Sequence, residues 1–228
     1  MSLSMFRDTT LVDGNALIEI LEESISPRLL NLGFVKKDKY LWYSPNIKTI
    51  RQGFAYSKLK GGQGTFTWGV CIDFIPIVSG NVLKFFKSEN KFKFHLFEWT
   101  EEYSHSFFGG QIRNGVTSHW EIKNAKKTIT KLFDNYEFKM QKWFDRTLQF
   151  DNIIAIAESQ INFGKQYNFH SPNPKYVLAF LYAQEKLTEK AIQTFDVLNL
   201  SNFNNNEELR LKTRAKLLTL IETNSNII

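Results

Sequence analysis

Cysteine is almost absent from this chain, since Cys71 is the single thiol among 228 residues. One thiol excludes an intramolecular disulfide framework and any metal site that needs several thiolates. It is compatible with a reducing compartment. The chain is long enough to bury a substantial core without covalent links, so we expect side-chain packing to hold the fold.

Long apolar runs are absent as well. No stretch approaches the roughly 18 uninterrupted apolar residues of a membrane-spanning helix. The start of the chain, MSLSMFRDTT, lacks the basic and then apolar order of a secretory signal. Hydrophobic residues make up 43% of the chain, with 21 phenylalanines, which excludes a largely disordered protein. We therefore expect a soluble, cytoplasmic protein without a membrane partner.

Acidic side chains are scarce in one segment. Residues 34–97 contain 11 basic and 3 acidic side chains, and over the rest of the chain the two signs nearly cancel. The net charge of the whole chain is +6. A basic segment favours anionic partners through screened, long-range attraction, but it does not say which anion.

The first periodic pattern is helical. Apolar residues recur at three- and four-residue steps over residues 13–32, with Asp13 as a possible cap and Gly33 as a possible end. Pro27 would lose a hydrogen bond inside this helix, so we expect a kink or break near Ser26.

The period then changes from about 3.6 to 2 residues, which is typical of strands. No helix of crossover length separates these segments, so they predict a mainly antiparallel sheet of about six strands. The predicted strands are two short ones within residues 33–44 that turn around Lys37–Lys39, followed by 48–58, 65–78, 91–99 and 116–123.

Helical periodicity returns after Asn124 and continues in several helices to the end of the chain, with Asn173 and Pro174 as a cap and first turn. Helices beside an antiparallel sheet make an α+β fold with a C-terminal helical appendage. We expect residues 1–165 to form the sheet-and-helix domain. Residues 166–228 are expected to form a helical hairpin or appendage packed on it.

The chain resembles the bacterial family called domain of unknown function 4304 in three stretches. They are LLNLGFVKKDKYLWYS, IRQGFAYSK and FTWGVCIDF. The residues that carry the resemblance, over about residues 15–150, are Leu29, Gly33, Phe34, Lys36, Lys37 and Trp42. The resemblance implies a helix-flanked sheet, and it brings no catalytic residues.

A second, weaker resemblance lies near residues 175–200, where YVLAFLYAQEKLTEKAIQTFDVL is similar to the helix pair of a tetratricopeptide repeat. No second copy follows at a period near 34 residues, and a solenoid needs about three repeats. The alternatives are a repeat array and a helical hairpin packed on the main domain, and the pattern favours the hairpin.

No complete catalytic or cofactor motif is present. The glycine-rich stretches 61–64 and 107–115 lead toward strands and lack the lysine and hydroxyl of a phosphate-binding loop. Glu102 and His105 have metal-ligand spacing but no second copy. Cys71 lies within a strand, away from the helix end or neighbouring cation that activates a thiol. We therefore assign no catalytic residue, metal or cofactor.

Strand alternation gives each strand one apolar and one polar row. If the apolar rows face the helices, the polar rows share the opposite face of the sheet. That face would be solvated, line a concave binding pocket, or lie under a covering helix with Asp73 as a buried ion-pair partner. The candidate binding residues on it are Arg51, Asp73, Lys93, His95, His119 and Glu121.

Nucleic-acid binding is a second possibility for the basic segment 34–97. Lysines can hold phosphates while aromatic side chains stack on bases. Alternation, however, would place phenylalanine and lysine on opposite faces of the strand at 91–96. The candidate residues are Lys36, Lys37, Lys39 and Trp42, followed by Lys84, Lys87, Lys91 and Lys93.

The leading hypothesis is a non-enzymatic module that binds a protein partner. It follows from the absence of a complete catalytic set and from the appended helices, and one form of it is an immunity-like role that neutralises a toxin. The alternatives are nucleic-acid binding and a small-molecule enzyme on the polar face of the sheet. The sequence leaves the partner, the presence of catalysis, the strand order and the oligomeric state open.

Overall fold

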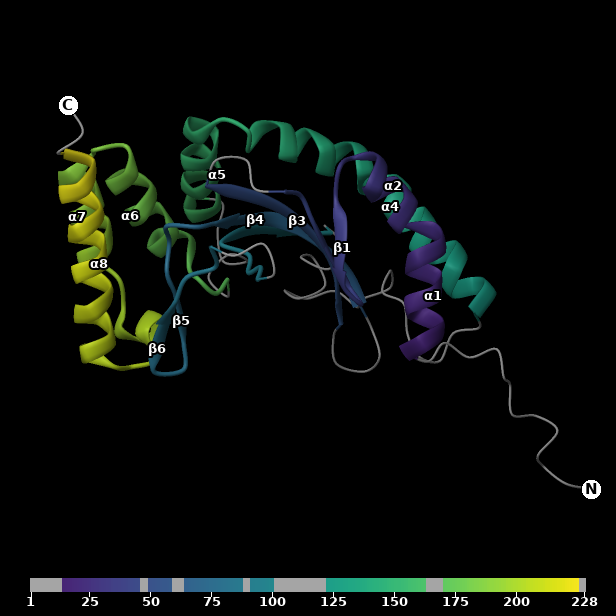
Figure 1. Ribbon diagram of the computed structural model, residues 1–228, viewed down its shortest axis with the longest axis horizontal. Coiled ribbons are helices and arrows are strands. Elements are labelled where there is room, and N and C mark those ends of the chain that lie inside the picture. The colour runs from purple at the N-terminus through teal and green to yellow at the C-terminus, as the bar shows by residue number, and fades with distance from the viewer. Residues whose placement is uncertain are drawn as a thin grey trace, which may run out of the picture. The chain divides into compact units, whose positions relative to one another are not determined.

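The computed structural model describes residues 14–45, 49–58, 64–87, 91–100, 122–162 and 170–225. They form an α+β fold with a five-stranded antiparallel sheet, a two-stranded hairpin and C-terminal helices that pack together (Figure 1). The predicted fold class is confirmed. No helix in these ranges combines the length and apolar character needed to cross a membrane.

The chain divides into two compact units. Unit 1 comprises Met1–Pro45, Gly53–Trp68 and Glu98–Trp143, and unit 2 comprises Asn46–Gln52, Gly69–Phe97 and Phe144–Ile228. The expected domain boundary at residue 165 falls outside the described residues.

In unit 1, the predicted break of the first helix is confirmed. Helix α1 (Gly14–Ser24) ends before Ile25, and α2 (Ser26–Asn31) begins with Pro27 in its first turn, where a missing N–H is tolerated. Gly33 then adopts a positive φ of 82°, and the amide of Phe34 donates to the carbonyl of Leu29 at 3.0 Å. This glycine-dependent turn ends the helix and starts the sheet.

The sheet has the order β1-β2-β3-β4-β7. The predicted short hairpin is confirmed, because β1 pairs with β2, but it turns at Lys39 and Tyr40, while Lys37 lies within β1. Trp42 of β2 lies opposite Phe54 of β3. The strands are β1 (Val35–Asp38), β2 (Leu41–Tyr43), β3 (Ile50–Lys58), β4 (Gly64–Ile72) and β7 (Leu96–Trp99).

The apolar rows of β3 and β4 pack on helix α4 (Ile122–Arg146), as the alternation predicts. In unit 1, Phe133 of α4 contacts Phe54 and Phe66 edge-on, with ring centroids 5.6 and 5.9 Å away. The ring centroids of Tyr136 and Trp68 lie 5.8 Å apart. All these rings are buried, so aromatic packing forms the core of unit 1.

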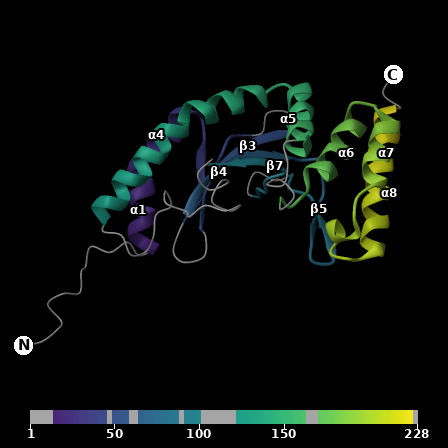
Figure 2. The ribbon, with the colours of Figure 1, turned by 180° about the vertical axis from the view of Figure 1, so that it is seen from behind.

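Unit 2 contains the hairpin of β5 (Ile77–Ser79) and β6 (Val82–Lys84) and a set of helices. Helix α6 packs on α5, α7 and α8, and these four helices lie side by side in Figures 1 and 2. The helices are α5 (Phe150–Asn162), α6 (Pro174–Gln184), α7 (Thr188–Asp196), the short 3-10 helix η4 (Leu200–Phe203) and α8 (Glu207–Ser225).

Three strand predictions need correction. The segment predicted at 65–78 is interrupted after Ile72, and the hairpin β5–β6, which turns at Gly80 with a φ of 59°, was not expected. Of residues 91–99, only Leu96–Trp99 form a strand. The predicted strand at 116–123 lies outside the described residues except at its end, where Ile122 already begins α4.

Candidate functional site

The polar row of β3 and β4 forms a buried cluster in unit 2. The Nη2 atom of Arg51 donates to Oδ1 of Asp73 at 3.1 Å, and only 1% of the Arg51 side chain and 12% of the Asp73 side chain are exposed. Arg51 lies in β3 and Asp73 in the turn that directly follows β4, and the ion pair places their side chains together, as alternation predicts. The alternative in which Asp73 is a buried ion-pair partner is therefore confirmed.

Backbone carbonyls complete the surroundings of Arg51. Its Nη1 donates to the carbonyl of Lys91 at 2.7 Å, and its Nη2 also donates to the carbonyl of Phe86. Guanidinium groups are well suited to such sites because their donors diverge in a fixed plane. The chain that contacts Arg51 at Phe86 and Lys91 is irregular. The covering helix of that alternative is therefore not what lies at these two positions.

His95 is also an interior group. Its Nδ1 accepts from the amide of Ile72 at 2.9 Å, and its Nε2 lies 3.0 Å from the carbonyl of Ile75, so Nε2 carries the proton. Burial, helped by the positive charges of Arg51 and Lys93, lowers the pKa of His95 to about 3. A neutral ring with both nitrogens bonded to backbone holds the end of β4 and cannot relay protons to a substrate.

Cys71 lies beside Arg51, and its Sγ is 3.4 Å from Nη2, so the expectation that no cation neighbours the thiol is wrong. The thiol is fully buried, and burial raises its pKa to about 11. A reactive cysteine needs a lowered pKa and access to solvent. The interpretation of Cys71 as a structural residue therefore agrees with its surroundings.

The six residues predicted on the polar face are thus divided. Arg51, Asp73 and His95 lie together and are buried, so of the three alternatives the solvated face is wrong for these residues. Lys93 is exposed and outside any strand, while His119 and Glu121 lie outside the described residues. Arg51 is buried because the backbone at Phe86 and at Lys91 lies against its guanidinium.

The first half of the predicted nucleic-acid surface also needs correction. Trp42 is fully buried, and its Nε1 donates to Oγ of Ser26 at 3.0 Å, so its ring cannot stack on a base. Lys36 forms an ion pair with Glu22. Lys37 lies over the buried ring of Tyr43, with Nζ 5.4 Å from the centroid, and Lys39 is exposed.

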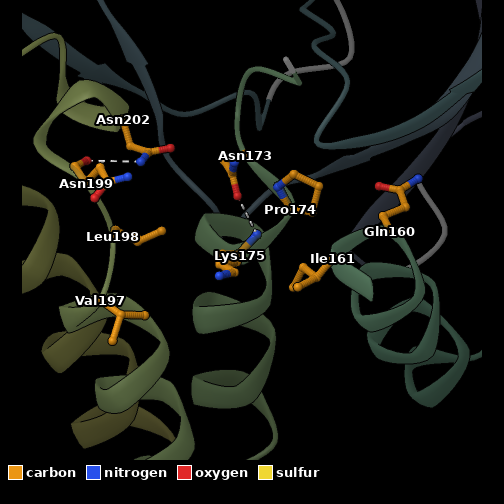
Figure 3. A pocket seen from close by; sticks show the side chains of 9 residues that line it. All are labelled: Gln160, Ile161, Asn173, Pro174, Lys175, Val197, Leu198, Asn199 and Asn202. Atoms are coloured by element: carbon orange, nitrogen blue, oxygen red, sulfur yellow. Dashed lines mark hydrogen bonds between the residues drawn. The ribbon is translucent and has the colours of Figure 1, made fainter. Parts of the chain in front are cut away.

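A surface cavity of about 200 Å³ lies among the helices of unit 2 (Figure 3). Its lining comes from the end of α5, the start of α6 and the link from α7 to η4. Among the described lining residues, carboxamides dominate the polar part and Lys175 is the one charged side chain. Val197 is 68% exposed. The lining residues are Gln160, Ile161, Asn173, Pro174, Lys175, Val197, Leu198, Asn199 and Asn202.

A second cavity of about 190 Å³ adjoins the first, since Asn173 and Asn202 line both. His170 lines this second cavity, and its ring stacks on that of Phe97 with the centroids 3.8 Å apart. Burial lowers the pKa of His170 to about 3, so the ring is neutral at physiological pH. Neither cavity was predicted from the sequence.

Two asparagines of the first cavity already bond to the backbone. Asn173 Oδ1 accepts from the amide of Lys175 at 2.9 Å, which confirms the predicted helix cap, and Asn202 Nδ2 donates to the carbonyl of Asn199 at 3.0 Å (Figure 3). These bonds fix the planes of both carboxamides. The Nδ2 of Asn173 can then donate a hydrogen bond to a ligand in the cavity, and the Oδ1 of Asn202 can accept one.

No group of three or more histidine, cysteine, aspartate or glutamate side chains in the described ranges has a metal-binding arrangement. Comparisons with protein-family models, curated proteins and solved structures found no match for this chain. The resemblance to domain of unknown function 4304 therefore stays a prediction.

Proposed function

We propose that this protein is a non-enzymatic module that binds another protein, and that the carboxamide-lined cavity of Figure 3 holds an extended segment of the partner. The observation that carries the proposal is this cavity beside the exposed Val197. The buried cluster supports it indirectly, because Arg51, Asp73 and His95 are already committed to bonds that hold the fold.

The chemistry of the lining favours a peptide. A carboxamide presents a donor and an acceptor, which matches the N–H and C=O groups of an extended backbone. The part of the lining that the structure describes contains no carboxylate to select a cation, and its single lysine gives it little preference for polyanions. Val197 and Ile161 supply apolar contacts for one side chain of the bound segment.

A site-specific crosslink in the native host tests the proposal. A photoreactive phenylalanine analogue replaces Val197 in one variant and Leu211 in a control, since both side chains are well exposed in unit 2 and Leu211 does not line the cavity. We expect one protein to crosslink at position 197 and not at 211. No adduct at 197, or the same adducts at both positions, contradicts the proposal.

Binding of the identified partner is then measured with purified proteins. Asn202→Ala removes a carboxamide of the cavity, and we expect about a tenfold weaker affinity, the size of one lost hydrogen bond in a desolvated contact. Asn152→Ala, on α5 and outside the cavity, is the matched control and should bind like the unaltered protein. Equal affinities for all three proteins would place the partner elsewhere.

A further inference from the structure

A cluster of lysines and phenylalanines lies on two short stretches of unit 2, residues 84–87 and 91–94, which we call the basic loop. Lys84, Lys87, Lys91 and Lys93 are exposed. None of the four forms an ion pair with another residue in the described ranges. Their charges are therefore available to an anionic ligand.

Aromatic side chains accompany these lysines. Phe85 is 36% exposed, and the rings of Phe92 and Phe94, half-buried, meet edge-on with centroids 4.9 Å apart. The Nζ of Lys87 lies 5.2 Å from the centroid of Phe85. Charge and ring faces thus occur together on the basic loop.

The sequence-based objection to nucleic-acid binding depended on strand alternation over residues 91–96. Residues 91–94 are not a strand, and both their lysines and their phenylalanines reach the surface. The separation of lysine and phenylalanine onto opposite faces of a sheet therefore does not apply here. Stacking and phosphate contacts can involve the same ligand.

Arg51 joins the two stretches of the basic loop. The carbonyls of Phe86 and Lys91 accept hydrogen bonds from one guanidinium, so these two backbone positions are neighbours. The guanidinium is in turn held by Asp73. A loop that is already fixed to a buried ion pair loses less conformational entropy when it binds a ligand.

We propose that the basic loop binds single-stranded nucleic acid, with lysines on phosphates and phenylalanine rings on bases. The order Lys-Phe-Phe-Lys and then Lys-Phe-Lys-Phe places a cation next to every ring, which suits a ligand whose charges and π-faces alternate along its chain. An acidic protein surface would use the lysines but leave the rings without a matching partner. This site is separate from the proposed peptide cavity and does not depend on it.

Fluorescence anisotropy with labelled oligo(dT) and oligo(U) of about 15 nucleotides, at about 50 mM KCl, tests the proposal. Four phosphate contacts to single strands predict that log K falls with log [KCl] with a slope of about −3. The two oligomers distinguish DNA from RNA as the source of the ligand, and binding of either supports the site. Absence of binding to both at this salt concentration overturns it.

Variants locate the binding on the basic loop. Lys91→Ala with Lys93→Ala should weaken binding about tenfold or more and make the slope shallower by about 1.4. Phe85→Ala should weaken binding about tenfold without changing the slope, because stacking releases no counterions. Lys212→Ala with Lys216→Ala, two exposed lysines of α8, is the matched control and should change little.

Three results would contradict the assignment. Unchanged affinity of the Phe85→Ala variant would exclude stacking, and an equal loss in the Lys212→Ala, Lys216→Ala variant would indicate a general charge effect. Poly-glutamate that competes as well as oligo(dT) at equal charge would favour an acidic protein surface as the ligand.

Discussion

The guanidinium of Arg51 in β3 bonds the carboxylate of Asp73, just after the end of β4, at 3.1 Å in the interior of unit 2. The same guanidinium holds the carbonyls of Phe86 and Lys91. One buried ion pair therefore links the sheet to the chain that covers it. Removing the carboxylate would leave a buried cation whose desolvation is no longer compensated.

We expect Asp73→Asn to lower the free energy of unfolding by about 3 kcal/mol, as is usual when one member of a buried pair is removed. Urea unfolding measures the change. Asp196→Asn is the control, because Asp196 pairs with Arg214 on the surface, where an ion pair is worth less than about 1 kcal/mol. Similar losses of unfolding free energy in both variants would show that the buried Arg51–Asp73 pair matters no more for stability than a surface pair.

Helix α4 offers a test of the aromatic core of unit 1. Phe133 is buried against Phe54 and Phe66, with the guanidinium of Arg28 4.6 Å from its centroid, whereas Phe138 on the same helix is 67% exposed. Phe133→Ala should cost about 4 kcal/mol through lost burial and a residual cavity. Phe138→Ala should change the stability by less than about 0.5 kcal/mol, and a comparable loss there would contradict the packing.

Alternation and helical period were sufficient to predict much of this fold. The break at Pro27, the cap at Asn173 and the packing of Phe54, Phe66 and Trp68 on α4 all follow from local patterns. Such local patterns are predictive because some residues fit few backbone positions. A proline in a helix, for example, is tolerated only in the first turn.

The surroundings of Arg51 were less predictable, because they include residues outside helices and strands. Period 2 in KFKFH suggested a strand, yet only Leu96 onward pairs in the sheet, and the preceding residues fold toward Arg51. Gly69 lies where another part of the chain approaches closely. A Cβ there would lie 2.3 Å from the carbonyl oxygen of Leu96, although glycine alone does not say what approaches. The cavity of Figure 3 arises from three separated segments, so no local pattern encodes it.

Cys71 should be inert in the folded protein. With its pKa raised to about 11 and its side chain buried, only about one thiol in a thousand is ionised at pH 8, and reagent cannot reach it. We expect a dithionitrobenzoate reagent to react only as fast as the protein opens, and to titrate one thiol per chain in urea. Complete reaction of the native protein within a minute would contradict the buried position.

His95 should make stability fall with acid. Its pKa is about 3 in the folded state and near 6.5 in the unfolded chain, so between these values the unfolded state binds more protons. The stabilising contribution is complete above pH 6.5 and is lost progressively as the pH falls toward 3. Between pH 6 and 5 the unaltered protein should lose about 1 kcal/mol more than a His95→Gln variant, as measured by urea unfolding. Parallel pH curves would exclude a depressed pKa.

The central claim is that the cluster of Arg51, Asp73 and His95 is interior and structural. Nitrogen-detected NMR of the His95 ring tests this claim most directly, with His95→Gln used to assign its signals. We predict a neutral ring with the proton on Nε2, unchanged from pH 8 to pH 5. A ring that titrates near pH 6.5, or that carries its proton on Nδ1, would place His95 in contact with solvent and contradict the account.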